Sequence, residues 1–336
     1  MRTRLTPIGL EVSGDAFTAA QVDRRSGSLR ASVRLDRAGA SSVPTGEELE
    51  RLTGVLDRQG FEGRRVVVSV PDADLLTAAL ELPPAESGAP VEQIGRAEFA
   101  RLHKRESGSL ELAMWPAGSA GRSGQMWLAV GCEHARANAL LDVLEAAGMR
   151  TVGLDARSAA LARVLGGVGR GEAGLSLLVD AGHDGALTVV LQGGQMVYQR
   201  FTPECGLAGV RKASEGTLGP EGAREAMYVV GLEADRRAET ATTASLREQA
   251  GSLGRDVGAA MAYAAHRHQA EVRGVWMSGP GAAVPGLARR VGELVGVEIR
   301  TLAPGASLVG AVEAGGADPA LATAIGLALY PMELAA

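Results

Sequence analysis

The sequence predicts a two-lobed α/β protein, because one strand-turn-strand unit occurs in both halves of the chain. The first copy starts at residues 8–12 and the second at residues 175–179. With 336 residues the chain exceeds one typical domain, and its 46% hydrophobic content suffices for a sizeable core. Segments with strand and helix periodicity follow each copy, which is typical of α/β proteins.

Both copies are expected to form β-hairpins with tight glycine turns. In the first copy, the apolar run 8–12 leads through a second run to alternating apolar residues over 29–35. In the second copy, the runs 175–179 and 187–191 flank a short turn, and Gly193-Gly194 lead into the next apolar run.

Each copy places an acidic residue two positions before a small one. Glu11 precedes Ser13 in the first copy, and Asp180 precedes Gly182 in the second. If the two turns face each other across a cleft, their small residues let backbone N–H groups approach phosphate oxygens. The two carboxylates can then hold Mg²⁺ directly or through water. Two ordinary hairpins with polar turns are the alternative explanation of the same pattern.

Apolar spacing, capping residues and glycine stops predict the other elements. Helices are expected over residues 47–59, 91–103, 133–147, 157–165, 245–268, 286–295 and 319–330. Strands are expected over residues 66–70, 75–82, 126–130, 272–277 and 297–302. Residues 206–254 are polar and give little that fixes a strand. The turn Ser278-Gly279-Pro280-Gly281 stands between a strand and a helix, which is a common setting for a ligand loop.

Charge and cysteine content exclude several classes of protein. Lys plus Arg total 34 against 39 Asp plus Glu, and the net charge of −5 comes with no basic stripe, so no nucleic-acid partner is expected. Cys132 and Cys205 lack metal-ligand spacing and are expected to be packing residues. No apolar run has the length of a signal peptide or a membrane helix, so the chain is expected to stay in the cytoplasm.

Four segments of the chain resemble the actin-like ATPase superfamily and, within it, the PilM family of type IV pilus assembly. They are Ile-Gly-Leu-Glu-Val-Ser at 8–13, Leu-Val-Asp-Ala-Gly at 178–182, Trp-Met-Ser-Gly-Pro-Gly-Ala at 276–282 and Ala-Ile-Gly-Leu-Ala-Leu at 324–329. The first two are similar to the family's phosphate loops, the third to its adenosine-side glycine turn, and the fourth to its closing helix. The resemblance implies a two-lobed actin-like ATPase fold with a duplicated ribonuclease H-like motif.

An inserted small α/β subdomain in the first lobe separates the PilM family from its relatives. Residues 140–149, Leu-Leu-Asp-Val-Leu-Glu-Ala-Ala-Gly-Met, are similar to the corresponding family segment. The resemblance implies a first lobe over residues 1–83, the inserted subdomain over 84–150, a return to the first lobe over 151–174, the second lobe over 175–318, and a closing helix back to the first lobe over 319–336.

The resemblance also implies a site for ATP with Mg²⁺ between the lobes. The positions that match the nucleotide-binding loops of the family are Glu11, Ser13, Gly14, Asp180, Gly182, Gly279 and Gly281. Among them, Asp180 and Glu11 match acids that hold Mg²⁺ through water. No residue is expected to be catalytic.

Departures from the family pattern at five positions disfavour nucleotide binding. Glu11 is one methylene longer than the family's aspartate, and Ser13 replaces a glycine whose missing Cβ allows close approach of a phosphate. Thr18 stands where the family has a lysine, Asp184 adds a charge that repels phosphate, and Pro280 lacks an N–H. Each lost hydrogen bond to phosphate removes roughly 1.5–3 kcal/mol. Weak or absent binding of ATP and Mg²⁺ is therefore expected, as in a pseudo-ATPase.

The resemblance implies a cytoplasmic adaptor that is peripheral to the inner membrane in a type IV pilus or type II secretion assembly. Its implied partner is the cytoplasmic tail of a PilN-like membrane protein, which would add a strand to a sheet edge between the first lobe and the inserted subdomain. Strand 66–70 and residues 85–148 are where this tail is expected to bind. Other assembly components and self-association are further implied contacts. The alternatives are an active Mg-ATP-dependent ATPase or small-molecule kinase of the same fold, and a filament-forming bacterial actin relative.

Overall fold

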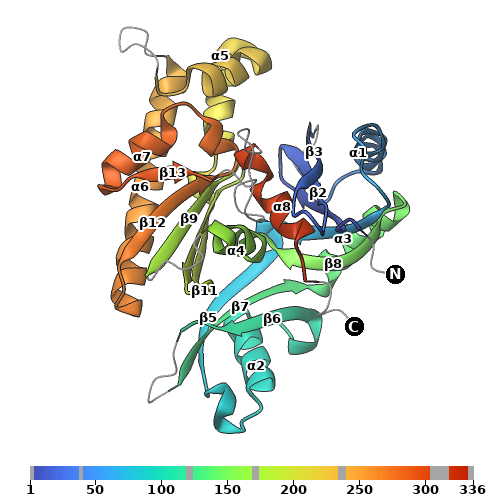
Figure 1. Cartoon of the computed structure of the whole chain (residues 1–336), viewed down its shortest axis with the longest axis vertical. Helices are drawn as coiled ribbons and strands as arrows, with labels where there is room; N and C mark the ends of the chain where they lie inside the picture. The colour runs from blue at the N-terminus through green and yellow to red at the C-terminus, as the bar shows by residue number, and fades with distance from the viewer. Residues whose placement is uncertain are drawn as a thin grey trace.

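The computed structural model describes residues 4–37, 41–118, 124–168, 174–233, 240–302 and 318–331, which form three β-sheets with helices packed around them (Figure 1). Two sheets have five strands each, one in each lobe, and the third has three strands. The small sheet lies below the two lobes in the view of Figure 1.

The two large sheets have the same strand order and the same strand directions. The first has the order β3 (Leu29–Asp36), β2 (Ala16–Val22), β1 (Ile8–Val12), β4 (Arg65–Val70), β8 (Arg150–Ala156). The second has the order β11 (Gln195–Thr202), β10 (Ala186–Gln192), β9 (Leu175–Ala181), β12 (Val272–Ser278), β13 (Ile299–Thr301). In each sheet the first three strands along the chain are antiparallel and the last two are parallel to their neighbours. The predicted duplication is confirmed.

Glycines with positive φ make the turns of the predicted hairpins. Gly27 has a φ of 68° between β2 and β3, and Gly193 and Gly194 have φ values of 58° and 83° between β10 and β11. Two successive residues with positive φ match the right-handed twist of the flanking strands, and glycine adopts this conformation at the lowest steric cost.

The helices form three layers around the two large sheets. Helices α1 (Gly46–Arg58) and α3 (His134–Ala146) cover the outer face of the first sheet, and α6 (Ala241–His268) and α7 (Leu287–Val295) cover that of the second. Between the sheets lie α4 (Arg157–Val168) and α8 (Ala322–Ala328). The helix α8 packs so closely on β1 that a Cβ on Gly9 would lie 2.0 Å from the carbonyl oxygen of Ala324.

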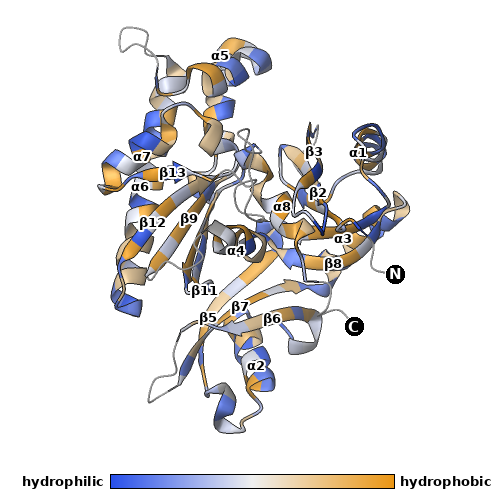
Figure 2. Cartoon of the chain, viewed as in Figure 1, coloured by the Kyte–Doolittle hydropathy of each residue, from blue (hydrophilic) through white to orange (hydrophobic). Residues whose placement is uncertain are grey.

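Alternation along β9 shows how both faces of a large sheet are buried. Leu175, Leu177 and Val179 pack against α6, whereas Leu178 points to the layer that contains α4 and α8. Side chains alternate between the faces of a strand, so a strand covered on both faces is apolar throughout. Figure 2 accordingly shows apolar colour along the strands and hydrophilic colour on the outward sides of helices such as α1.

The segments that form the small sheet differ from those expected for the inserted subdomain. The sheet has the order β5 (Leu75–Leu82), β7 (Gln125–Glu133), β6 (Leu110–Pro116), and α2 (Val91–His103) buries Phe99 against it. The strand β5, expected within the first-lobe segment 1–83, therefore pairs in the small sheet. Conversely, α3 lies within the expected insert 84–150 but buries Leu140 and Leu144 in the core of the first lobe. Residues 303–317 and 332–336, within the expected second lobe and closing helix, lie outside the described residues.

Three elements were not expected from local pattern: β6, β8 and α5 (Ala208–Glu225). The strand β8 contains a glycine and two charged residues, Arg150 and Asp155, and α5 is kinked at Gly219, with a φ of 70°, just before Pro220. The periodicity of these three segments is weak, so their conformation depends on packing against neighbouring elements. No helix in the described part of the chain is long and apolar enough to cross a membrane.

The prediction that a partner tail adds to strand 66–70 is wrong. This strand forms β4, which lies between β1 and β8 and is paired on both sides. A strand with two neighbours has no free edge for a third. Among the described strands, β3 and β8 form the free edges of the first sheet.

Candidate functional site

The turns of the two hairpins meet between the lobes, and the structure brings the two predicted acids together there. Each acid accepts a hydrogen bond within its own lobe. The Thr18 hydroxyl donates to Glu11 Oε2 over 2.7 Å, and the Ser278 hydroxyl donates to Asp180 Oδ1 over 2.5 Å. The acids are close enough for the negative charge of Asp180 to raise the pKa of Glu11.

A buried arginine that the sequence analysis did not single out lies among these acids. Arg157, the first residue of α4, is only 6% exposed. Its Nη1 lies 3.2 Å from Oδ2 of Asp72, in the short turn η1 (Asp72–Asp74) after β4, and its Nε lies 3.7 Å from Oδ2 of Asp180. The guanidinium also stands over the ring of Phe201, 5.7 Å from its centroid. Arg157 thus bridges an acid of the first lobe and an acid of the second.

The guanidinium of Arg157 interacts with four carboxylates, those of Asp72, Asp180, Glu11 and Asp184. The pKa values of the acids reflect this surplus of negative charge. Burial raises the pKa of Glu11 to about 7, and the charges of Asp180 and Asp72 add to this effect against the opposing effects of Arg157 and Thr18. Burial likewise raises the pKa of Asp72. Burial alone would lower the pKa of Arg157, but the surrounding carboxylates outweigh it and raise that pKa, so the guanidinium stays charged.

The tip of the first hairpin contacts the turn of the second directly. The Gly14 N–H donates to Oδ2 of Asp184 over 2.7 Å. A Cβ on Gly14 would lie 2.3 Å from Oδ1 of the same carboxylate. The Ser13 hydroxyl meanwhile donates within its own turn, to Asp15 and to the carbonyl of Ala16, each over 2.9 Å. The predicted phosphate loop is therefore occupied by contacts within the protein.

The other predicted glycines allow protein segments to pack closely around Asp180. A Cβ on Gly182 would meet the carbonyl of Gly185 at 2.8 Å and the guanidinium of Arg157 at 3.2 Å. At Gly279, where φ is 78°, a Cβ would lie 2.9 Å from Asp180 Oδ1, and at Gly281 it would lie 2.5 Å from the Cβ of Ala181. The need for glycine at these positions follows from packing within the chain and, at Gly279, also from the positive φ.

A cavity of about 380 Å³ opens between the lobes beside this cluster. It is lined by Asp15, Arg34, Asp36, His183, Leu207, Arg211, Pro220, Glu221, Arg224, Met227, Tyr228, Pro280, Ala283, Asp318 and Ala320. Burial would raise the pKa of Asp15, but Arg34 and His183 outweigh it and lower that pKa. Within the described part of the chain, neither Glu11 nor Asp180 lines the cavity, whereas Asp15 and His183 do.

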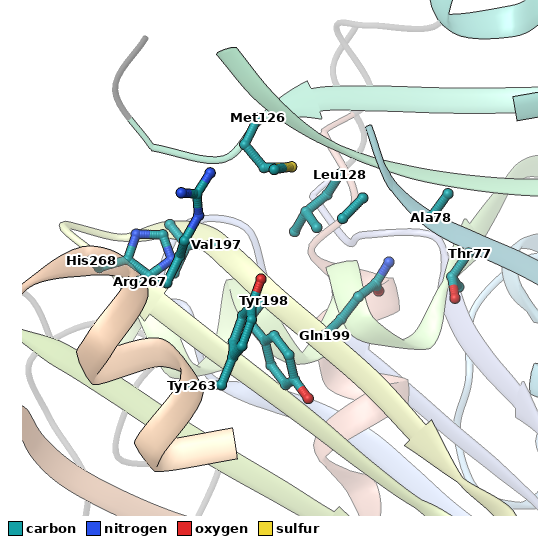
Figure 3. Close-up of a pocket in the computed structure, with 11 residues that line it drawn as sticks. Thr77, Ala78, Met126, Leu128, Val197, Tyr198, Gln199, Tyr263, Arg267 and His268 are labelled. Carbon is teal, nitrogen blue, oxygen red and sulfur yellow. The ribbon is translucent and has the colours of Figure 1, made fainter. Parts of the chain in front are cut away.

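A second, smaller cavity of about 180 Å³ lies away from this cluster, between the small sheet and the second lobe (Figure 3). Tyr198 of β11 and Tyr263 of α6 stand side by side there, with ring centroids 5.2 Å apart. Next to this cavity, the Trp115 indole donates to the carbonyl of Met196 over 3.3 Å. The small sheet therefore touches the second lobe as well as the first.

Comparison with known proteins identifies the fold. No protein-family model and no curated protein sequence matches the chain. A solved structure described as a PilM-PilN type IV pilus biogenesis complex superposes with a TM-score of 0.76 and 17% identity, over 97% of this chain and 98% of that chain. The chain has a PilM-like actin-like ATPase fold. The predicted fold class is thereby confirmed.

Two further solved structures share the actin-like fold over nearly their whole length. The ethanolamine utilization protein EutJ from Carboxydothermus hydrogenoformans has a TM-score of 0.58 and 15% identity, over 98% of this chain and 91% of that one. MreB5 of Spiroplasma citri, whose structure is described as bound to ADP, has a TM-score of 0.54 and 11% identity, over 99% and 98%. Identities this low show the shared fold alone.

Sequence reasoning missed the residues that complete the cluster. Asp72 follows a proline in a short turn, and Arg157 begins a helix, so neither stands in a recognisable motif. The sequence analysis treats Asp184 only as a charge that repels phosphate. The one signal that pointed to it was its place in the turn of the second hairpin. No group of three or more His, Cys, Asp or Glu side chains in the described ranges is arranged to hold a metal ion.

Proposed function

We propose that this protein is a PilM-like adaptor of a type IV pilus or type II secretion assembly, at the cytoplasmic face of the inner membrane. It would hold the cytoplasmic tail of a PilN-like membrane protein without needing nucleotide turnover. The similarity to the PilM-PilN structure over nearly both whole chains supports this proposal, because the small inserted sheet is part of the matched region. Contacts with other assembly components and self-association belong to the same proposal.

The free edge of β8 is the observation that carries the proposed partner site. Among the described strands, β4 is the one that pairs with β8, so the opposite edge of β8 can accept another strand. Residues 151–155 of β8 are all half-buried. Leu154 packs in the same cluster as Leu75 and Cys132 of the small sheet, so this edge lies at the junction that the family resemblance implies.

An extended tail would bind there through main-chain hydrogen bonds, with its alternate side chains in the groove. The Thr151 hydroxyl is buried and has no hydrogen-bond partner among the described residues, so a polar group of an added chain could satisfy it. The neighbouring Val152 and Leu154 are half-buried and pack in apolar clusters of the protein, so the main chain of β8 would make most of the contacts with an added strand.

Strand addition can be tested with a synthetic peptide that carries the cytoplasmic tail of the PilN-like protein of the same genome. Bound peptide should slow amide exchange in residues 150–156 and leave β3, the other free edge of the same sheet, unchanged. N-methylation of alternate peptide residues should weaken binding about tenfold in one register and little in the other, because only one set of N–H groups faces β8. Equal effects in both registers, or protection of β3 instead, would contradict the proposed site.

Nucleotide independence is the second part of the proposal. Two hydrogen bonds support it. The Gly14 N–H donates to the carboxylate of Asp184, and the hydroxyl of Thr18, at the position where the family has a lysine, donates to Glu11. Titration calorimetry with Mg-ATP should give no heat of binding at about millimolar nucleotide, where a dissociation constant of 1 mM would already be visible.

The enzyme alternative makes the opposite prediction. An active ATPase or kinase would bind ATP in a magnesium-dependent way, and Asp180→Ala would abolish that binding. For the adaptor, Asp180→Ala should leave the affinity for the tail peptide unchanged if the variant remains folded. Sedimentation of the protein with and without ATP separates both functions from a filament-forming actin relative, which would pellet as a polymer.

A further inference from the structure

We propose that Arg157 and Asp184 are built-in substitutes for a metal ion and a phosphate, so that the phosphate end of the cleft is closed by the protein's own side chains. The inference rests on the proposed loss of nucleotide binding and explains how the two lobes stay together without nucleotide. It does not depend on which partner the protein holds.

Asp184 stands where the first phosphate loop would present its N–H to an anion. Its Oδ2 accepts a hydrogen bond from the Gly14 N–H over 2.7 Å, and its Oδ1 lies 2.3 Å from where a Cβ of residue 14 would be. Close approach of an oxygen anion to a glycine N–H is the contact that small residues in a phosphate loop permit. Here the anion comes from the opposite lobe of the same chain, so a phosphate would have to displace it.

Arg157 stands where a cation would neutralise the acids of both lobes. Its guanidinium lies within 3.2 Å of Asp72 and 3.7 Å of Asp180, and its charge also acts on Glu11. The Nε and Nη2 atoms are buried without a hydrogen-bond partner among the described residues, so charge, rather than a full set of hydrogen bonds, holds the group there. A Mg²⁺-bound phosphate does not fit these residues, because the guanidinium already takes the space between the acids.

The contacts of both substitutes cross from one lobe to the other. Arg157 joins Asp72 of the first lobe to Asp180 of the second, and Asp184 of the second lobe binds Gly14 of the first. The adjoining cavity ends short of Glu11 and Asp180, as expected if the phosphate end is filled and only the outer part of the cleft is open. The angle between the lobes would therefore be set by the amino-acid sequence rather than by a ligand.

Amide exchange in the two hairpin turns, residues 11–18 and 180–186, provides the test for Arg157. The variant Arg157→Met removes the charge while keeping most of the side-chain volume, and Arg157→Lys keeps the charge. We expect exchange in both turns to accelerate about tenfold in the methionine variant and far less in the lysine variant. Equal acceleration in the two variants would mean that the charge of residue 157 does not hold the turns in place, and this would overturn its role as a cation.

A separate pair of variants tests Asp184, which is exposed and whose replacement leaves the buried core unchanged. Asp184→Ala should accelerate exchange of the Gly14 amide about fivefold to tenfold, whereas Asp184→Asn, which keeps an acceptor oxygen, should change it little. Asp142→Ala, on the exposed face of α3, is the control. An unchanged Gly14 amide in Asp184→Ala would overturn the role of Asp184 as a phosphate substitute.

A third measurement uses the wild-type protein, so it does not depend on whether any variant folds. Exchange in both turns should be the same with and without Mg-ATP. Added protection by Mg-ATP would overturn the inference and the proposed nucleotide independence together. Equal behaviour of Arg157→Met and Arg157→Lys, or no effect of Asp184→Ala, would overturn the inference alone, and loss of tail binding would bear on the adaptor role alone.

Discussion

The turns of the two hairpins occupy equivalent places in equivalent sheets, yet their acids are held differently. Glu11, near the end of β1, accepts a hydrogen bond from the hydroxyl of Thr18 on the neighbouring strand β2, and its pKa is raised to about 7. Asp180, near the end of β9, accepts a hydrogen bond from the hydroxyl of Ser278 on β12 and forms an ion pair with Arg157. A duplicated backbone therefore does not give duplicated chemistry, because the copied strands carry different side chains at matching positions: Thr18 lies opposite Glu11, whereas Leu187 lies opposite Asp180.

The glycines at the two turns differ in the same way. At Gly14 the space for a Cβ is filled by the end of a flexible carboxylate side chain, that of Asp184. At Gly182 it is filled by the backbone carbonyl of Gly185 and by the guanidinium of Arg157. The first turn can adjust to a change more easily than the second, since a side chain moves at lower cost than a backbone.

The largest expected effect is on the pH dependence of stability. Because the pKa of Glu11 is about 7 in the folded protein and 4.5 ordinarily, the folded state holds a proton that the unfolded state has lost between these values. Its contribution is fully present below pH 4.5 and is lost as pH rises to 7, by up to about 3 kcal/mol. In Glu11→Gln this loss should be absent, so urea unfolding from pH 4.5 to 8 should show a flatter profile.

Asp142→Asn is the matched control for that change, since Asp142 is an exposed acid on α3 and its removal should leave the profile of the wild type. Parallel profiles of Glu11→Gln and the wild type would show that Glu11 is ionised at the same pH in both states, and the contrast between the two acids would then fail.

A smaller effect separates the two glycines. Gly182→Ala should lower the free energy of unfolding by about 2 kcal/mol, because its Cβ would push the Gly185 backbone and Arg157 apart. Gly14→Ala should cost about 1 kcal/mol, the net value of the hydrogen bond that Asp184 would give up. Urea unfolding at one pH measures both, and equal losses would remove the proposed difference in rigidity between the turns.

The smallest effect is expected at the rim of the cleft. Arg224 lies 3.1 Å from Asp36 across the lobes, but the two side chains are 68% and 54% exposed. Arg224→Ala should therefore cost less than about 1 kcal/mol, and the loss should vanish in high salt because exposed charges are screened. A larger loss of unfolding free energy that does not depend on salt would mean that the ion pair at the rim, as well as Arg157, holds the lobes together.

Local pattern predicted the elements that have strong periodicity or clear turn residues. The hairpins around Gly27 and Gly193, helix α2 and most of helix α6 appear where the sequence analysis expected them. It failed for β8 and α5, whose own patterns are weak, and it assigned β4 a free edge that the order of the sheet denies it. Strand order depends on contacts between distant segments, which periodicity along a single segment does not encode.

The sequence alone established that one hairpin unit occurs twice, with an acid near the end of each first strand and a small residue just after that strand, since turn chemistry and alternation act over a few residues. Only the tertiary structure decided what those acids face. Arg157 and Asp72 come from a helix start and a short turn, and packing of the lobes brings them beside Glu11 and Asp180. Burial and mutual charge, which set the proton affinity of such a cluster, exist only after the lobes have come together.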